Sequence, residues 1–280
     1  MLPARVGLMW IGVVVAGSLV VACGGDDSDD AGTTSTEAPG TTTTASEGID
    51  RVVDIGGRGL YLRCTGSGSP TVVLEGGDED TSTSYGFAED ALADVTTTCV
   101  YDRANLGQSD PAPGPRGLVE LVGDLESLID AADIPGPYVL VGTSGGGYIV
   151  AGYAIAHPDE VAGMVLVDTA APLADPPPEL IEETAWDNPV NVEHRDYLQV
   201  ERDAWAARRQ IGDIPVTIIT VDYGDRAELD AERSNVEDQQ GWLVLSPRAE
   251  QVVVTTSHAV EEDDPDLVLG AILDVVRAAP

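Results

Sequence analysis

Lysine is absent from this 280-residue chain, and positive charge of any kind is scarce. The 14 basic residues are all arginines and stand against 49 acidic residues, so the formal net charge is −35 at pH 7. A surface this negative repels phosphate backbones, so no nucleic acid is expected as a partner. Strongly anionic substrates are disfavoured as well, unless arginines line the site. The simpler role of the charge is solubility or salt tolerance.

Aromatic residues are also few, at 5% of the chain with a single phenylalanine. The core must therefore be built from Val, Leu, Ile and Ala, which the ordinary apolar fraction of 43% allows. Cysteine occurs only at positions 23, 64 and 99. An odd number in an exported protein leaves one cysteine for a separate role, which falls to Cys23. Cys64 and Cys99 are then predicted to form one disulfide in an oxidising compartment.

The N-terminal segment has the composition of an export sequence. Arg5 precedes an apolar run over residues 6–21, which is shorter than the roughly 20 residues of a comfortable transmembrane helix. The string L-V-V-A-C at residues 19–23 resembles the lipobox of bacterial lipoproteins, which implies that Cys23 is lipidated. Residues 1–22 are thus predicted to be a lipoprotein signal peptide, with an ordinary cleaved signal or a membrane anchor helix as the alternative.

Residues 23–48 contain almost no large apolar side chains and are predicted to be a disordered tether. The folded domain is predicted over residues 49–280. Together these segments predict an exported protein, lipid-anchored to the outer face of a bacterial membrane or released from it.

Short apolar runs alternate with amphipathic stretches through the predicted domain. Strands are predicted at residues 59–64, 71–74, 99–102, 138–142, 162–168, 216–221 and 251–255. Helices are predicted at 87–93, 118–132, 146–157 and 267–279. This alternation predicts an α/β fold with a mostly parallel sheet and helices on both faces. Residues 170–213 interrupt it and are predicted to form a small cap near the site, or else a surface excursion without a role.

The sharpest functional motif is G-T-S-G-G at residues 142–146, which follows a predicted strand and opens a predicted helix. This is the context of a nucleophile elbow, in which a tight turn lifts a serine hydroxyl clear of the sheet. Ser144 is therefore the candidate nucleophile. The backbone N–H of Gly145, at the helix N-terminus, is a candidate donor to an oxyanion.

A serine hydroxyl needs a base, and the chain offers three histidines. His258 follows the last predicted strand, late in the chain, and is the candidate base. His157 stands at the end of a helix and His194 in the predicted cap, and both are expected to be structural or surface residues. The order of nucleophile, acid and histidine along the chain is that of the α/β-hydrolase triad.

The acid that orients the histidine is ambiguous from sequence. Asp168 ends one predicted strand and is the favoured candidate, while Asp222 or Asp225 after the next strand is the alternative. Gly77, in the loop after the strand at 71–74, is the candidate second oxyanion donor, because glycines let a backbone approach a substrate closely. A plain turn is the alternative reading of that loop.

Several strings resemble the α/β-hydrolase superfamily and fall in its order across nearly all of residues 50–280: PTVVLEGG, CVYDRANLGQSD, PYVLVGTSGGG, HPDEVAGMVLVD and TSHAVEEDDPDLV. The resemblance is strongest to secreted bacterial members in which a cysteine precedes Tyr-Asp-Arg, and it implies the same roles for Ser144 and His258. Glu75 and Thr143 depart from the family, which often has histidine at both positions. Asp168 matches the acid of some relatives, such as certain haloalkane dehalogenases, but a serine nucleophile argues against dehalogenation.

The predicted function is hydrolysis of a carboxylic ester or similar acyl bond, with a small-molecule or lipid-like ester as substrate and no metal or cofactor. The alternatives are other chemistry on the same fold, namely a peptidase or a cofactor-free haloperoxidase. A catalytically silent envelope binding protein is the alternative of another class.

Overall fold

The structure is a computed structural model that describes residues 48–175, 185–224 and 236–280. The strands are β1 (Ile49–Asp54), β2 (Gly59–Thr65), β3 (Thr71–Glu75), β4 (Thr98–Tyr101), β5 (Tyr138–Thr143), β6 (Val161–Val167), β7 (Pro215–Val221) and β8 (Arg248–Val254). The α-helices are α1 (Gly86–Ala93), α2 (Leu118–Ala132), α3 (Gly146–Ala156), α5 (Tyr197–Ala207), α6 (Val236–Gln239), α7 (Val260–Asp263) and α8 (Pro265–Ala278). The predicted signal peptide, Cys23 and nearly all of the predicted tether lie outside the described residues.

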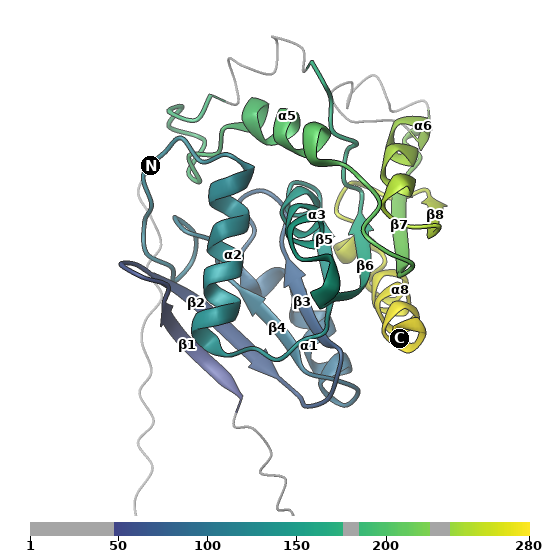
Figure 1. Cartoon of the computed structure of the whole chain (residues 1–280), viewed down its shortest axis with the longest axis horizontal. Coiled ribbons are helices and arrows are strands. Elements are labelled where there is room, and N and C mark those ends of the chain that lie inside the picture. The colour runs from purple at the N-terminus through teal and green to yellow at the C-terminus, as the bar shows by residue number, and fades with distance from the viewer. Residues whose placement is uncertain (1–47, 176–184, 225–235) are drawn as a thin grey trace, which may run out of the picture. The chain divides into compact units, whose positions relative to one another are not determined.

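One eight-stranded sheet runs in the order β1-β2-β4-β3-β5-β6-β7-β8 (Figure 1). The pairs from β4 to β8 are parallel, while β2 runs antiparallel to both β1 and β4. From β3 the chain passes to β4 on one side, and it later enters β5 on the other side. The loops after β3 and β5 therefore part at the carboxyl edge of the sheet, where such a reversal opens a crevice.

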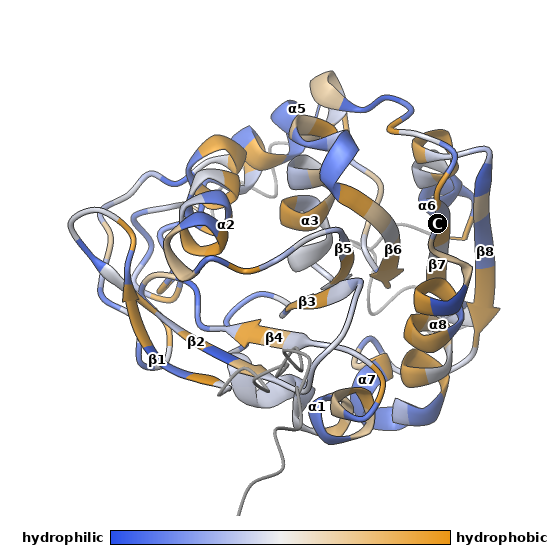
Figure 2. Ribbon diagram, turned by 60° about the horizontal axis from the view of Figure 1, so that its bottom comes forward, coloured by the Kyte–Doolittle hydropathy of each residue, from blue (hydrophilic) through white to orange (hydrophobic). Residues whose placement is uncertain are grey.

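The central strands are buried on both faces, as their continuous apolar runs predict. Leu140 of β5 belongs to an apolar cluster with residues of α2 and α3, whereas Val139 and Val141 belong to a second cluster with residues of α1 and α8. Figure 2 shows these two helix pairs on opposite sides of the sheet. The prediction of a mostly parallel sheet covered on both faces is thus confirmed.

Cys64 of β2 and Cys99 of β4 form a disulfide, the pairing predicted from the cysteine count. They are register partners in the antiparallel β2–β4 pair, and both are buried.

Between β6 and β7, the segment predicted as a cap contains α5, which packs against α2 and α3. Residues 176–184 of that segment lie outside the described residues. Within the described residues, every helix is too short or too polar to span a bilayer.

Candidate functional site

Ser144 stands in the turn between β5 and α3. Its φ of 48° lies in the left-handed region, which is strained for a residue other than glycine. Two backbone hydrogen bonds hold the turn: Ser144 N–H donates to Val167 O at 2.8 Å, and Gly147 N–H donates to Ser144 O at 3.0 Å. The serine is therefore fixed at the carboxyl edge of the sheet, as the nucleophile-elbow motif predicts.

The glycines after Ser144 are required by close contacts. A Cβ on Gly145 would lie 1.9 Å from Asp78 Oδ1, and a Cβ on Gly147 would lie 2.0 Å from Thr169 Oγ1. Real Cβ atoms do not approach other atoms so closely. A side chain at position 145 would displace the side chains of Asp78 and Arg195, and one at position 147 would displace that of Thr169.

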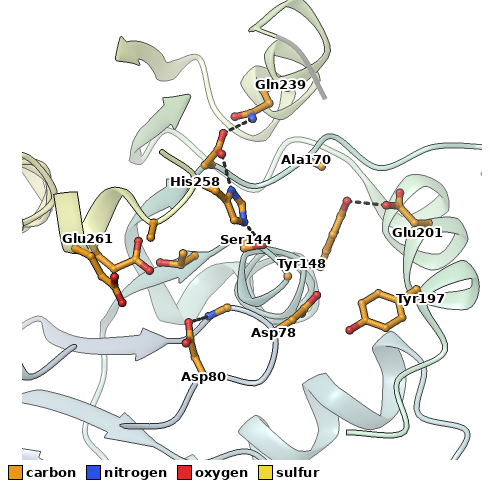
Figure 3. Close-up of a pocket in the computed structure, with 16 residues that line it drawn as sticks. Asp78, Asp80, Ser144, Tyr148, Ala170, Tyr197, Glu201, Gln239, His258 and Glu261 are labelled. Carbon is orange, nitrogen blue, oxygen red and sulfur yellow. Dashed lines mark hydrogen bonds and ion pairs between the residues drawn. The ribbon is translucent and has the colours of Figure 1, made fainter. Parts of the chain in front are cut away.

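His258 lies on the loop between β8 and α7 and bridges two side chains (Figure 3). Its Nε2 is 2.8 Å from Ser144 Oγ, and its Nδ1 is 2.7 Å from Asp168 Oδ2. The three residues follow β5, β6 and β8, so parallel strands bring them together at one edge. The arrangement can move a proton from the serine hydroxyl to the imidazole, with the carboxylate holding the ring in place.

Asp168 is buried and receives several hydrogen bonds besides that of His258. Gln239 Nε2 donates to Oδ1 at 2.8 Å, Val221 N–H donates to the same oxygen at 3.2 Å, and the Tyr223 hydroxyl donates to Oδ2. Burial by itself would raise the pKa of Asp168, but the hydrogen bonds from His258, Tyr223 and Gln239 outweigh it and hold this pKa below its usual value. The carboxylate therefore stays ionised beside the imidazole.

The other candidates lie elsewhere. Asp222 is exposed and accepts a hydrogen bond from Gly224 N–H at 2.9 Å, and Asp225 lies outside the described residues. His157 follows α3 and lies 3.5 Å from Glu126. His194 has a backbone carbonyl that accepts from Arg116 N–H at 2.9 Å, and its imidazole is absent from the pocket described below.

The two candidate oxyanion donors differ in their present partners. Gly145 lies at the N-terminus of α3, where backbone N–H groups have no acceptor within the helix. Gly77 lies beside the serine, since a Cβ built on it would be 3.4 Å from Ser144 Cβ. Its N–H, however, donates to Asp80 Oδ2 at 2.9 Å. In this state Gly77 is next to the nucleophile but its N–H is engaged by a side chain.

Arg103, which sequence analysis did not single out, holds the loop after β3. Its Nη1 donates to Gly76 O at 2.7 Å, its Nη2 donates to Gly77 O at 2.5 Å, and its Nη1 also pairs with Glu75 Oε1 at 2.6 Å. The guanidinium is almost fully buried. Glu75, in the position where family members often have histidine, is thus the acidic partner of the arginine that fixes this loop.

Glu193 links the same network to the segment between β6 and β7. Its carboxylate accepts from Arg103 Nε at 2.7 Å, from Glu79 N–H at 2.8 Å and from Arg195 Nη2 at 3.3 Å. Burial opposes its ionisation, but the charges of Arg195 and Arg103 hold the pKa of Glu193 well below its usual range. Burial raises the pKa of Glu75 despite the neighbouring Arg103. The network therefore joins the crevice to the predicted cap by buried ion pairs.

A cavity of about 480 Å³ lies over Ser144. Helix α5 of the predicted cap contributes Tyr197 and Glu201 to its lining (Figure 3). Glu201 accepts hydrogen bonds at 2.8 Å from the Tyr148 hydroxyl and from Leu173 N–H, yet burial raises its pKa. Across the described part of the chain, no cluster of three or more His, Cys, Asp or Glu side chains is arranged to hold a metal ion.

Comparison with known proteins agrees with this geometry. A family described as having the alpha/beta hydrolase fold matches residues 70–238. The uncharacterized protein YqjL of Bacillus subtilis is 26% identical over 228 residues, which are 76% of this chain and 86% of that protein. Four further curated relatives match 39% to 48% of this chain, which spans at most 40% of their own length.

Solved structures resemble the chain over most of its length. The enol-lactonase from Burkholderia xenovorans LB400 superposes with a TM-score of 0.63 and 18% identity, over 81% of this chain and 100% of that one. A thermophilic esterase from Thermogutta terrifontis superposes with a TM-score of 0.58 and 20% identity, over 83% and 98%. At these identities the likeness concerns the fold alone.

Proposed function

Because the chain belongs to the alpha/beta hydrolase fold family, we propose that it is a serine hydrolase that cleaves a carboxylic ester through an acyl-enzyme on Ser144. The observation that carries the proposal is the continuous hydrogen-bonded series from Ser144 Oγ through the imidazole of His258 to Asp168. It opens into a cavity large enough for a small acyl group.

In the proposed reaction, Ser144 Oγ bonds to the ester carbonyl carbon while His258 Nε2 takes the hydroxyl proton. Asp168 keeps the proton on Nδ1 and stabilises the imidazolium. The Gly145 N–H donates to the oxyanion, and the Gly77 N–H joins it once the Asp80 carboxylate moves away.

The imidazolium then gives its proton to the departing alkoxide, and the C–O bond of the ester breaks. Water attacks the acyl-enzyme with His258 as base, and the bond from Ser144 to the carbonyl carbon breaks. The carboxylic acid leaves and the serine hydroxyl is restored.

A fluorophosphonate probe and nitrophenyl acetate hydrolysis test the proposal. We expect the wild type to be labelled and active, and Ser144→Ala to be unlabelled with activity reduced about 10⁵-fold or more. Asp222→Asn is the matched control, since this exposed carboxylate hydrogen-bonds only locally in the described structure. A folded wild type that neither reacts with the probe nor hydrolyses esters would instead favour a silent envelope binding protein.

We also propose that the protein is exported and anchored by a lipid on Cys23. The support is the L-V-V-A-C string at residues 19–23 and the Cys64–Cys99 disulfide, a bond typical of oxidising compartments. The Cys23→Ser variant should lose the label of a fatty-acid analogue and leave the membrane fraction of expressing bacteria. Unchanged labelling of that variant would refute the anchor.

A further inference from the structure

Six of the residues that line the cavity carry carboxyl groups: Asp78, Asp80, Asp168, Glu201, Glu261 and Glu262. Three of them have strong partners. Arg195 forms an ion pair with Asp78, Tyr148 donates to Glu201, and His258 lies against Asp168. These three carboxyl groups are thus engaged by groups of the protein itself, and Glu262 is exposed to solvent.

Asp80 and Glu261 lie together on another wall of the cavity, and no positively charged side chain is paired with either in the described structure. Asp80 accepts the Gly77 N–H at 2.9 Å. Glu261 is 8% exposed, and its Oε2 has no hydrogen-bond partner in the described structure. Figure 3 shows both side chains lining the cavity on the side of Ser144 away from Glu201.

A buried carboxylate oxygen without a partner is unfavourable, because it loses its hydration and gains no hydrogen bond in return. Burial raises the pKa of Glu261 and the negative charges of Asp80 and Glu262 raise it further, while its own backbone N–H and the nearby His258 only partly oppose this rise. A cation placed between the two side chains would relieve both effects. The net charge of −35 would also concentrate cations near the cavity.

Resting on the proposed hydrolase function, we propose that Asp80 and Glu261 form a subsite for a cationic group, such as a substituted ammonium, carried by the ester substrate. Asp80 also holds the Gly77 N–H, so a substrate cation that draws Asp80 away would free this donor for the oxyanion. The subsite thus selects the substrate and prepares the site for it.

Two pairs of esters matched in shape test the subsite. In each pair one ester carries trimethylammonium and the other tert-butyl, on the acyl part in the first pair and on the alcohol part in the second. We expect kcat/KM of the wild type to favour the cationic ester about tenfold or more in at least one pair. Glu261→Gln and Asp80→Asn should each reduce this preference several-fold, while Glu250→Gln, which removes an exposed carboxylate on β8, should not.

Equal kcat/KM within both pairs, or a preference that Glu261→Gln leaves unchanged, would overturn the subsite while leaving the hydrolase proposal intact. A second measurement separates the two proposals if no ester is cleaved. Calorimetry on Ser144→Ala with the corresponding amides should show tighter binding of the cationic member, reduced in Ser144→Ala/Glu261→Gln. Equal binding of both amides would refute the subsite whatever the activity.

Discussion

Arg103 makes an extensive set of hydrogen bonds near the site. It donates to two consecutive loop carbonyls, Gly76 O and Gly77 O, and pairs with Glu75 and Glu193. A planar guanidinium with five donors can serve all of these acceptors at once, whereas a lysine ammonium cannot. In a chain without lysine, this arginine determines where the loop after β3 lies.

The acid of the site is tested by Asp168→Asn. Asn tolerates the positive φ of 43° at this position, so the backbone should be retained. The amide cannot enforce the Nδ1–H tautomer of His258, and we expect kcat for nitrophenyl acetate to fall about 10⁴-fold. Asp222→Asn should stay within a few-fold of the wild type, and the reverse result would assign the acid to Asp222.

At the residue scale, the sequence predicts the candidate catalytic side chains that follow strands, but it does not predict the buried ion pairs around them. Ser144, His258 and Asp168 each follow a recognisable apolar run, so a parallel sheet brings them to one edge. Arg103 and Glu193 carry no such mark, because their partners come from loops distant in the sequence and are set by the folded structure. The Y-D-R string that ends four residues after Cys99 marks the position of Arg103, but its burial is visible only in the structure.

Among the elements, strands buried on both faces are predicted well from sequence. Thr71–Glu75 and Tyr138–Thr143 read as short apolar runs and form β3 and β5 close to the predicted bounds. Ile49–Asp54 was not predicted, because as the outermost strand it buries only Val53 fully. The four-residue helix Val260–Asp263 is acidic at its last three residues and is too short to show an apolar period.

The attachment of the segment between β6 and β7 should depend on pH through Glu193. Its pKa is lowered in the folded state, so its contribution to stability is present above the unfolded pKa of about 4.3 and is lost as pH falls through the folded value. Glu193→Gln leaves Arg103 and Arg195 without this carboxylate, and we expect it to lower the free energy of unfolding by about 3–5 kcal/mol at pH 7.

Urea unfolding between pH 7 and pH 2 measures this effect. The difference between the wild type and Glu193→Gln should narrow as pH falls below about 4.3, because the unfolded wild type then binds a proton on Glu193 that the folded state does not yet bind. Glu120→Gln is a control, since its carboxylate accepts only a backbone N–H, that of Gly117, in the described structure. A difference that stays constant with pH would show that the charge of Glu193 is not what stabilises the fold.

The disulfide joins two neighbouring strands across a separation of 35 residues. Closing a loop of this size lowers the entropy of the unfolded chain by an amount worth about 3–4 kcal/mol. The double variant Cys64→Ala/Cys99→Ala should therefore have a free energy of unfolding lower by this amount, measured by urea unfolding. Reduced wild type should behave like the variant, and equal stability of the oxidised and reduced forms would contradict the argument.

For the molecule as a whole, the charge of −35 is the dominant electrostatic feature. Mutual repulsion of like charges destabilises a compact state, and salt screens it. Raising the ionic strength from about 0.01 M to 0.15 M shortens the screening length from about 30 Å to about 8 Å. We expect Tm to rise over this range in scanning calorimetry, equally with NaCl and KCl. A Tm that falls would mean that local ion pairs such as Arg103–Glu193 outweigh the general repulsion.

The positive φ of Ser144 implies that the proposed activity and the stability of the fold make opposite demands on the residue at position 144. Glycine would relax a backbone that serine holds under strain, at the loss of the hydroxyl. We expect Ser144→Gly to be inactive. Its free energy of unfolding should exceed that of Ser144→Ala by about 1 kcal/mol, and its Tm should be correspondingly higher. Mutational drift without selection for the reaction would then favour glycine at this position.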